Sequence, residues 1–438
     1  MARKRGFAHV LLACYLLASL IAAGAYDYTS GDFIPGPPAE HLKSDAGFES
    51  AWGPDTKTLR DENLAAFILV MEPGTLRPPH YADADLLMAV LQGTAHAGII
   101  NDKGEETGVR RFRRGDVIAL PAGWATWILN NDTEQKFTLL AAARPVDVPG
   151  ELSKFEVFPL MAGEVTGQSS LLHGFTKDIL AEAFNTDEDL VEQIQTKTPD
   201  SGLVKLGSAE LMAMDEELKQ RSAHDDSGLM YNVDEADPDF TSDFGQVTLL
   251  DCERLSILKN LSLGAVKVSL KPGAMLLPRY KTTATMFGFI TAGRARVQVA
   301  QPDGSTGADA ELGPGEAFVV PRFFPSTQKS VGDKKLEGIG FVSSAYLQSG
   351  TVFLAGKNSI YRAVPNSVLA AATQVDKAKI QQCVSNQPAT VIAGREKGWF
   401  REKVETIVEE IREGLAGGVK EEVMKTLGAP KRVLEKEL

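Results

Sequence analysis

The chain has 438 residues, with 46 basic and 58 acidic side chains and a formal net charge of −12 at pH 7. This length is sufficient for two domains that each bury a hydrophobic core, and a charged fraction of 24% is typical of a globular protein. Since no basic run follows the first few residues, the acidic balance excludes a role in binding DNA or RNA.

The N-terminus has the three parts of a secretory signal peptide. MARKRGFAH is basic, VLLACYLLASLIAA is apolar, and the small residues AGA precede Tyr26. The apolar run is shorter than the roughly 20 residues that cross a bilayer, so the pattern favours cleavage near Tyr26 over a membrane anchor. We therefore expect a signal peptide at residues 1–25 and an N-terminal arm at 26–45. The mature chain should enter the secretory pathway and should not be anchored in a membrane.

An internal repeat with an offset of about 200 residues dominates the rest of the chain. GTLRPPHYADADLLMAVLQG, which begins at Gly74, matches GAMLLPRYKTTATMFGFITAG, which begins at Gly273, and GDVIALPAG matches GEAFVVPRF. In both copies the glycine that begins the second motif lies 22 positions after the glycine that ends the first, at 93 and 115 and at 293 and 315. Two motifs that keep one spacing indicate two copies of the same domain.

Each copy alternates short apolar runs with turn residues. Runs such as AAFILVM, DVIALP and RVQVA are rich in β-branched residues and bounded by Gly, Pro, Asn or Asp, so they predict β-strands. NDKG and QPDGS are typical turn sequences. We expect two β-sandwich or barrel domains in tandem, at 46–222 and 239–394, joined by an acidic connector at 223–238.

A helical segment follows each of these domains. ILAEAFNTDEDLVEQI, from Ile179, aligns with VLAAATQVDKAKIQQC, from Val368. Thr186 is the expected N-cap of a helix whose first turn carries three acids, which suit the positive end of the helix dipole. Residues 395–438 contain apolar side chains at helical spacing and predict a helical C-terminal tail.

Two cysteines and two sequons bear on secretion. Once the signal peptide is removed, Cys252 and Cys383 remain, and the sequence leaves open whether they form a disulfide. Asn131, in NDT, and Asn260, in NLS, fit the N-glycosylation sequon.

The pattern G…PHxxxA…G followed by GDxxxxPAG resembles the cupin superfamily. Two copies with trailing helices, and segments such as RRGDVIALPAGWATWILNND and LLHGFTKDILAEAFNT, resemble the vicilin-type seed globulins over residues 44–394. The resemblance implies an all-β fold with helical extensions, in which tandem jelly-roll barrels (a bicupin) are each followed by a helical segment. It also implies a non-enzymatic storage protein of a protein storage vacuole or of the extracellular space.

The resemblance further implies that the protein assembles with other copies of itself. Vicilin-type proteins assemble as homotrimers in which the helices after each barrel clasp the neighbouring barrel. Small and apolar helical residues should then form the contact. The candidate interface residues are Ile179, Leu180, Phe184, Val368 and Leu369.

Metal-binding cupins hold a divalent transition metal through three histidines and a carboxylate. By resemblance, these ligand positions fall on His80, Ala82, Asp85 and Thr126 in the first copy and on Arg279, Lys281, Ala284 and Ser326 in the second. The second copy keeps no ligand, and its two cations would repel a metal. We expect no cofactor and interpret His80 as a buried, hydrogen-bonded histidine. The alternative is a metal in the first barrel held by His80, Asp85 and His96.

Two other functions remain open from the sequence. One is a metal-dependent oxidase or dioxygenase that uses His80, Asp85 and His96, although the sequence contains no GxSxG, HExxH or phosphate-loop motif and predicts no catalytic residue. The other is a module that binds a sugar or an anion, since a small barrel holds one small ligand. Its candidate ligand-binding residues are Tyr81 and Trp124 in the first barrel and Arg279, Tyr280 and Lys281, which suit an anion, in the second.

Overall fold

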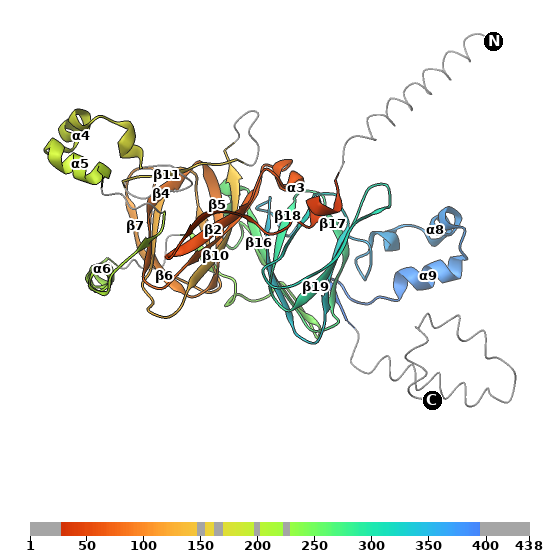
Figure 1. The fold of residues 1–438 in the computed structure, drawn as a ribbon. Coiled ribbons are helices and arrows are strands. Elements are labelled where there is room, and N and C mark those ends of the chain that lie inside the picture. The colour runs from red at the N-terminus through yellow and green to blue at the C-terminus, as the bar shows by residue number, and fades with distance from the viewer. Residues whose placement is uncertain (1–27, 147–153, 162–169, 197–201, 222–227, 395–438) are drawn as a thin grey trace, which may run out of the picture. The chain divides into compact units, whose positions relative to one another are not determined.

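The computed structural model describes residues 28–394 except for 147–153, 162–169, 197–201 and 222–227 (Figure 1). The predicted signal peptide and the predicted C-terminal tail therefore lie outside the described residues. Within them, four sheets form two barrels that follow one another along the chain. The predicted fold class, tandem jelly-roll barrels with helical extensions, is confirmed. No described helix has the length and apolar character needed to cross a membrane.

The first barrel is formed by antiparallel strands. They are β1 (Ala39–Ser44), β2 (Gly47–Trp52), β3 (Ala65–Met71), β4 (Thr75–Ala82), β5 (Ala84–Gln92), β6 (Thr94–Ile100), β7 (Glu106–Arg113), β8 (Asp116–Leu120), β9 (Ala125–Asn130), β10 (Phe137–Pro145), β11 (Val157–Pro159), β12 (Val204–Lys205) and β13 (Met230–Asn232). One sheet has the order β1-β2-β3-β10-β5-β8-β13, and the other has the order β11-β4-β9-β6-β7 with β12 beside β4.

The second barrel repeats this topology. Its strands are β14 (Phe240–Ser242), β15 (Gly245–Leu250), β16 (Gly264–Leu270), β17 (Met275–Lys281), β18 (Met286–Ala292), β19 (Arg294–Ala300), β20 (Thr306–Leu312), β21 (Ala317–Val320), β22 (Ser326–Val331), β23 (Leu336–Val342), β24 (Thr351–Phe353) and β25 (Ile392–Ala393). The orders β14-β15-β16-β23-β18-β21 and β20-β19-β22-β17-β24 correspond to those of the first barrel, and β25 lies beside β17. The sequence repeat is therefore a repeat of the fold.

Short helices connect and extend the barrels. They are α2 (Ser30–Phe33), α3 (Lys57–Arg60), η1 (Leu171–Gly174), α4 (Lys177–Phe184), α5 (Glu188–Thr196), α6 (Ser208–Gln220), α7 (Leu258–Leu261), η2 (Ile360–Ala363), α8 (Asn366–Thr373) and α9 (Lys377–Ser385). The predicted N-cap Thr186 is wrong by one residue. Oδ1 of Asp187 accepts a 2.7 Å hydrogen bond from the backbone N–H of Leu190, so Asp187 caps α5.

The two barrels share a hydrophobic core because β5 is buried on both of its faces. Leu86 and Met88 point into the first barrel, whereas Leu87 belongs to a cluster that also contains Phe287 and Phe289 of β18. Successive side chains of a strand point to opposite faces. A strand that is covered on both faces therefore has an unbroken apolar sequence, and LLMAV at 86–90 of β5 is such a sequence.

The predicted N-terminal arm joins the second barrel. Tyr28 and Phe33 are buried in the core of that barrel, where both rings lie 5.6 Å from the ring of Phe324. The arm then returns to the first barrel, since β1 pairs with β2. Residues near the N-terminus of the described chain thus stabilise a domain that begins two hundred residues later.

The predicted connector at 223–238 differs from the structure near its middle. Residues 230–232 form β13, which pairs with β8 and extends the first barrel. The side-chain amide of Asn232 donates to Oδ1 of Asp116 at 2.8 Å and anchors this strand. A polar, acidic composition predicts a loop, but here the polar side chains fix a strand instead.

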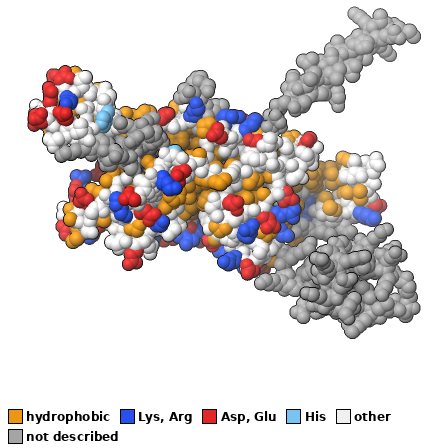
Figure 2. All heavy atoms as spheres, in the orientation of Figure 1, with side chains coloured by type: hydrophobic (Ala, Val, Ile, Leu, Met, Phe, Trp, Pro, Cys, Tyr) orange, Lys and Arg blue, Asp and Glu red, His pale blue; other side chains and the backbone are white. Residues whose placement is uncertain are grey.

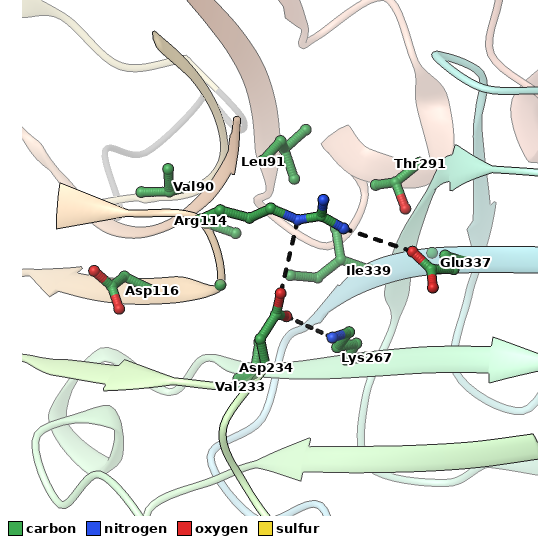
Figure 3. A pocket seen from close by; sticks show the side chains of 13 residues that line it. Val90, Leu91, Arg114, Asp116, Val233, Asp234, Lys267, Thr291, Glu337 and Ile339 are labelled. Atoms are coloured by element: carbon green, nitrogen blue, oxygen red, sulfur yellow. Dashed lines mark hydrogen bonds and ion pairs between the residues drawn. The ribbon is translucent and has the colours of Figure 1, made fainter. Parts of the chain in front are cut away.

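A cavity of about 50 Å³ is lined by residues of both barrels, and several of them are charged (Figure 3). Arg114, from the first barrel, lies 3.7 Å from Asp234 of the connector and 3.7 Å from Glu337 on β23. Lys267 on β16 lies 2.5 Å from the same Asp234. All four groups have a partner of opposite charge, so this cavity is lined by a satisfied network that ties the connector to both barrels.

Candidate functional site

Two prolines put Arg77 and His80 on the same face of β4. Side chains three residues apart on a regular strand point to opposite faces. Pro78 and Pro79 have no N–H to donate to β9, and the pairing of the two strands shifts between Arg77 and His80. Both side chains are therefore buried inside the first barrel, with exposed fractions of 4% and 7%.

His80 is held in one neutral tautomer. Its Nδ1 lies 2.8 Å from the carbonyl oxygen of Pro78, and its Nε2 lies 3.2 Å from Nε of Arg77. A carbonyl only accepts and a guanidinium only donates, so Nδ1 carries the proton and Nε2 accepts. Burial lowers the pKa of His80 to about 3, and the positive charge of Arg77 contributes to the decrease. This is the buried, hydrogen-bonded histidine that the sequence favoured.

The guanidinium of Arg77 is neutralised by Glu49, which lies on β2 in the opposite sheet. Arg77 donates to one carboxylate oxygen of Glu49, and Nε2 of His41 lies 2.9 Å from the other. Burial alone would raise the pKa of Glu49, but the charge of Arg77 and the hydrogen bonds from His41 and Arg77 lower it to about 2. The first barrel therefore contains a buried Glu49–Arg77 ion pair, with the buried His80 beside Arg77 and the exposed His41 beside Glu49.

His96 points away from His80. It lies on β6 between Ala95 and Ala97, which face the barrel core, so the alternation of side chains directs it to the outer face. There it lies near Asp215 of α6, and partial burial lowers its pKa. The two histidines lie on opposite faces of one sheet and cannot share a metal ion.

Asp85 lies in the sheet opposite His80 and forms a hydrogen bond with the turn that follows β8. It lies on β5, and its Oδ1 accepts a 2.9 Å hydrogen bond from the backbone N–H of Ala122. Among the described residues, no group of three or more His, Cys, Asp or Glu side chains is placed to hold a metal ion. The set of His80, Asp85 and His96 that the sequence allowed is not assembled, and the donors present do not fit a metal.

The candidate aromatic residues of the first barrel have protein partners. The ring of Tyr81 stacks on Phe158 of β11, with centroids 4.8 Å apart and an angle of 11° between the planes. Trp124 is half-buried and packs against the first-barrel core. These contacts are structural, and they give no support to a sugar platform at these two residues.

Arg279 occupies in the second barrel the position that His80 has in the first. It lies opposite Ser326, as His80 lies opposite Thr126. Its Nη2 donates to Oε1 of Gln328 at 2.9 Å, and its Nη1 lies 3.4 Å from a backbone carbonyl oxygen of its own strand. Burial lowers the pKa of Arg279 to about 10, and no carboxylate of the described chain forms an ion pair with it.

Lys281 adds a second cation on the same face of β17. Its Nζ donates to Oγ1 of Thr351 at 3.1 Å. Burial lowers the pKa of Lys281 to about 8, and the charge of Arg279 contributes to the decrease. Tyr280 lies between the two cations on the strand, so its side chain points to the opposite face. The structure therefore brings Arg279 and Lys281 together and leaves Tyr280 out.

A cavity of about 50 Å³ lies beside Arg279 inside the second barrel. Its lining is largely apolar and includes Met286 and Phe318, while Arg279 and Gln328 supply polar atoms. A Cβ at Gly288 would lie 2.3 Å from the ring of Phe318, so glycine makes room for that ring. A largely apolar cavity beside one half-buried guanidinium is an environment that favours a small organic anion.

Comparison with known proteins identifies the family. The cupin profile matches residues 34–192 and 231–381, which together form more than half of the chain. The chain belongs to the cupin family. An 11S globulin seed storage protein of Anacardium occidentale is 27% identical over 424 residues, which cover 83% of this chain and 92% of the relative. A vicilin-like seed storage protein of Arabidopsis thaliana is 28% identical over 379 residues, which cover 74% of this chain and 72% of the relative.

Solved structures agree with this assignment. A vicilin of Solanum melongena has a TM-score of 0.72 and 21% identity to this cupin, over 83% of this chain and 97% of that chain. That vicilin holds different anionic ligands in structurally similar pockets. The relatives are seed storage globulins, so the resemblance and the prediction of a non-enzymatic protein are confirmed, and the relatives support a storage role.

The helices that follow each cupin barrel form hairpins with exposed apolar side chains. Ile179, Phe184 and Val368 have exposed fractions of 53%, 52% and 54%, and Leu369 is half-buried. Leu180 is only 5% exposed, and α4 and α5 pack against each other. Of the five candidate interface residues, Leu180 therefore offers the least surface to a second copy.

The sequons and cysteines of this cupin occupy different environments. Asn131 is half-buried, and its side-chain amide donates to Asp215 of α6 at 2.9 Å. Asn260 is exposed on α7. Cys252 is half-buried, Cys383 is exposed, and both are free thiols, so the structure contains no disulfide between them.

Proposed function

We propose that this cupin is a seed storage protein that reaches a protein storage vacuole or the extracellular space through the secretory pathway. The observation that carries the proposal is the likeness to seed storage globulins over both barrels, which extends to 83% of the chain. The first barrel supports it, because its buried Arg77 and His80 are engaged with partners of the same chain. Storage requires a stable, densely packed chain and no reactive group.

Quantitative immunoblotting of a seed time course tests the storage role. We expect the protein to accumulate during seed maturation, to fractionate with storage vacuoles or the apoplast, and to disappear during germination. Cell fractions from leaf and root serve as controls. A constant, low level in all tissues, unchanged by germination, would contradict storage.

A homotrimer is the assembly that we infer for this chain. The α4–α5 hairpin and the α8–α9 hairpin both expose apolar side chains, and a contiguous exposed apolar surface marks an interaction site. Residues 171–196 carry six acidic side chains and one basic, whereas residues 357–386 carry four basic and one acidic. Acidic side chains accordingly gather over α4 and α5 (Figure 2). Opposite charges favour a head-to-tail contact between the first hairpin of one copy and the second hairpin of the next, which closes into a ring.

Single charged substitutions in the hairpins should dissociate the assembly. Ile179→Asp and Val368→Asp each place a carboxylate on an exposed apolar position of one hairpin, and burying that charge in a contact is unfavourable. We expect size-exclusion chromatography with light scattering to give the mass of a trimer for the wild type and of a monomer for both variants.

Met212→Asp is the matched control for these variants. Met212 is the most exposed large apolar side chain among the described residues, at 72%, and it lies on α6 outside both hairpins. It should keep the wild-type mass. A trimer that survives both hairpin substitutions would refute the interface.

A second candidate function is the binding of a small organic anion in the second barrel. Arg279 favours it, because a half-buried guanidinium that forms no ion pair with a carboxylate of the described chain is stabilised when an anion neutralises it. Lys281 lies on the same face and adds positive charge. The apolar lining of the adjoining cavity suits the hydrocarbon part of a small carboxylate.

Removal of the guanidinium should abolish this binding. We expect isotope-labelled acetate, followed by NMR, to bind the wild type and to lose about tenfold or more in affinity in Arg279→Ala, because a hydrogen bond to a charged group contributes about 1.5–3 kcal/mol. Arg294→Ala, at an exposed position of β19, is the control and should bind acetate normally. Binding that persists when Arg279→Ala is combined with Lys281→Ala would place the anion elsewhere.

A further inference from the structure

Two aromatic side chains in the core of the second barrel come from the N-terminal arm. Tyr28 and Phe33 are buried there, and the ring of each lies 5.6 Å from that of Phe324. A Cβ at Gly307 on β20 would lie 2.8 Å from the ring of Phe33, so the glycine makes room for this ring. Two hundred positions earlier, in the first barrel, the residue is Thr107. The surroundings of Phe324 and Gly307, which we call the arm seat, therefore fit this segment.

The corresponding place in the first barrel is occupied by the connector. Its strand β13 pairs with β8, and the carbonyl oxygen of Leu229 accepts a 2.8 Å hydrogen bond from the backbone N–H of Ala119. In the second barrel α2 packs against β21, the strand that corresponds to β8. Each barrel is thus completed by the segment that precedes the other barrel.

A short segment joins the arm to the first barrel. Residues 35–38, which we call the tether, have the sequence PGPP, and the three prolines have no N–H to donate. Gly36 and Pro37 are exposed, and Nε1 of Trp52 donates to the carbonyl oxygen of Gly36 at 2.9 Å. Because we expect the signal peptide to be cleaved near Tyr26, the tether is the covalent link that keeps the arm with the barrels.

We propose that the arm seat is a peptide-binding site of the second barrel, that residues 28–34 are its occupant, and that one cut in the tether empties it. The site takes a segment with two aromatic side chains five positions apart, as in YTSGDF. Hydrogen bonds to α3 and the residue that follows it add to the contact. Oγ1 of Thr58 donates to the carbonyl oxygen of Asp32, and Oη of Tyr28 donates to Asp61 at 3.1 Å.

The tether decides whether the arm seat stays occupied. A short link between two binding partners gives an effective concentration on the order of millimolar. In a micromolar protein solution, a cut lowers that concentration about a thousandfold. A free segment also loses translational and rotational freedom when it binds, and two aromatic rings with a few hydrogen bonds are a small contact to offset that loss. A cut in the tether therefore exposes the apolar arm seat and opens the second barrel at β20 and β21.

The test cuts the tether in an otherwise intact mature chain. The recognition sequence of a site-specific protease is inserted between Gly36 and Pro37. The control chain carries it between Asp102 and Lys103, in the exposed turn from β6 to β7, where a cut leaves both strands paired. Each protein before its cut is its own reference. We expect size-exclusion chromatography to separate the arm from the barrels after the first cut only. Hydrogen exchange in β20 and β21 should then rise at least about tenfold, while that in β6 and β7 stays unchanged.

A synthetic peptide covers the case in which the cut protein unfolds or aggregates. The peptide YTSGDFIPG, residues 28–36, at about 1 mM during the cut should keep exchange in β20 and β21 at its level before the cut. The same peptide with Phe33→Ala should not. An arm that stays bound after the cut contradicts the proposal. So does exchange that is unchanged after the arm has left, and exchange that rises but does not respond to the peptide.

Discussion

Replacing Glu49 by glutamine should destabilise the protein by about 3–5 kcal/mol, because the charge of Arg77 would then be buried without its partner. Both side chains are less than one tenth exposed, so water cannot solvate the guanidinium in the place of the carboxylate. Glutamine keeps the shape of the side chain and the ability to accept one hydrogen bond. The change therefore reports the lost charge rather than a cavity. Urea unfolding at pH 7, compared with wild type, measures it.

Glu40→Gln is the matched control. Glu40 lies on β1, beside the strand that carries Glu49, and pairs with Lys43 at 3.2 Å, but both side chains of that pair are well exposed. Its removal should change the free energy of unfolding by less than about 1 kcal/mol. Equal effects of the two substitutions would show that the buried ion pair contributes no more than a surface pair.

The pH dependence of unfolding gives an independent measurement of the same pair. The pKa of Glu49 is about 2 in the folded protein, against an ordinary value of 4.5. Its contribution is therefore complete above pH 4.5 and is lost as the pH falls towards 2, and a shift of this size corresponds to about 3 kcal/mol. Glu49→Gln lacks this contribution, so the difference in stability between the two proteins should shrink across that range.

The sequence predicted the barrels because their signals are local. Short β-branched runs, turn sequences and the glycines at 93 and 293 recur at one offset, and each run became a strand. The burial of β5 on both of its faces is also indicated locally, because its sequence is an uninterrupted apolar run. These features depend only on neighbours along the chain.

The site could not be predicted in the same way, because its contacts are long-range. Glu49 and Arg77 are 28 residues apart and lie in different sheets, and nothing in GFESAW marks its glutamate as buried. One signal was available: two consecutive prolines in a strand predict a shift in strand pairing. That shift puts Arg77 beside His80, whereas regular alternation would have separated them.

The positions of His80 and His96 in the sequence could not show whether they face each other. A turn and a change of strand lie between them, so only the register through β9 decides which face of the sheet each side chain occupies. The same limit applies to Leu180. Its apolar character predicted a contact between copies, but not that only 5% of Leu180 would be exposed within its own chain.

Trp52→Ala is expected to have the second large effect, a loss of about 3–5 kcal/mol, because it empties the centre of the core between the barrels. Trp52 is 4% exposed, and its ring lies 5.3 Å from that of Phe287 and 6.1 Å from that of Phe289. Its Nε1 also donates to the carbonyl oxygen of Gly36 at 2.9 Å, in the part of the N-terminal arm that precedes β1.

The loss should appear as a change in cooperativity as well as in stability. Because Trp52 belongs to the first barrel and both phenylalanines to the second, its removal weakens the docking of the barrels more than the core of either. We expect calorimetry to show one unfolding transition for wild type and two for Trp52→Ala. Tyr346→Ala, at an exposed position, should keep a single transition at the wild-type Tm. A single transition of unchanged Tm in Trp52→Ala would mean that the barrels are held together by the ion pairs around Arg114 and Asp234 and not by this apolar cluster.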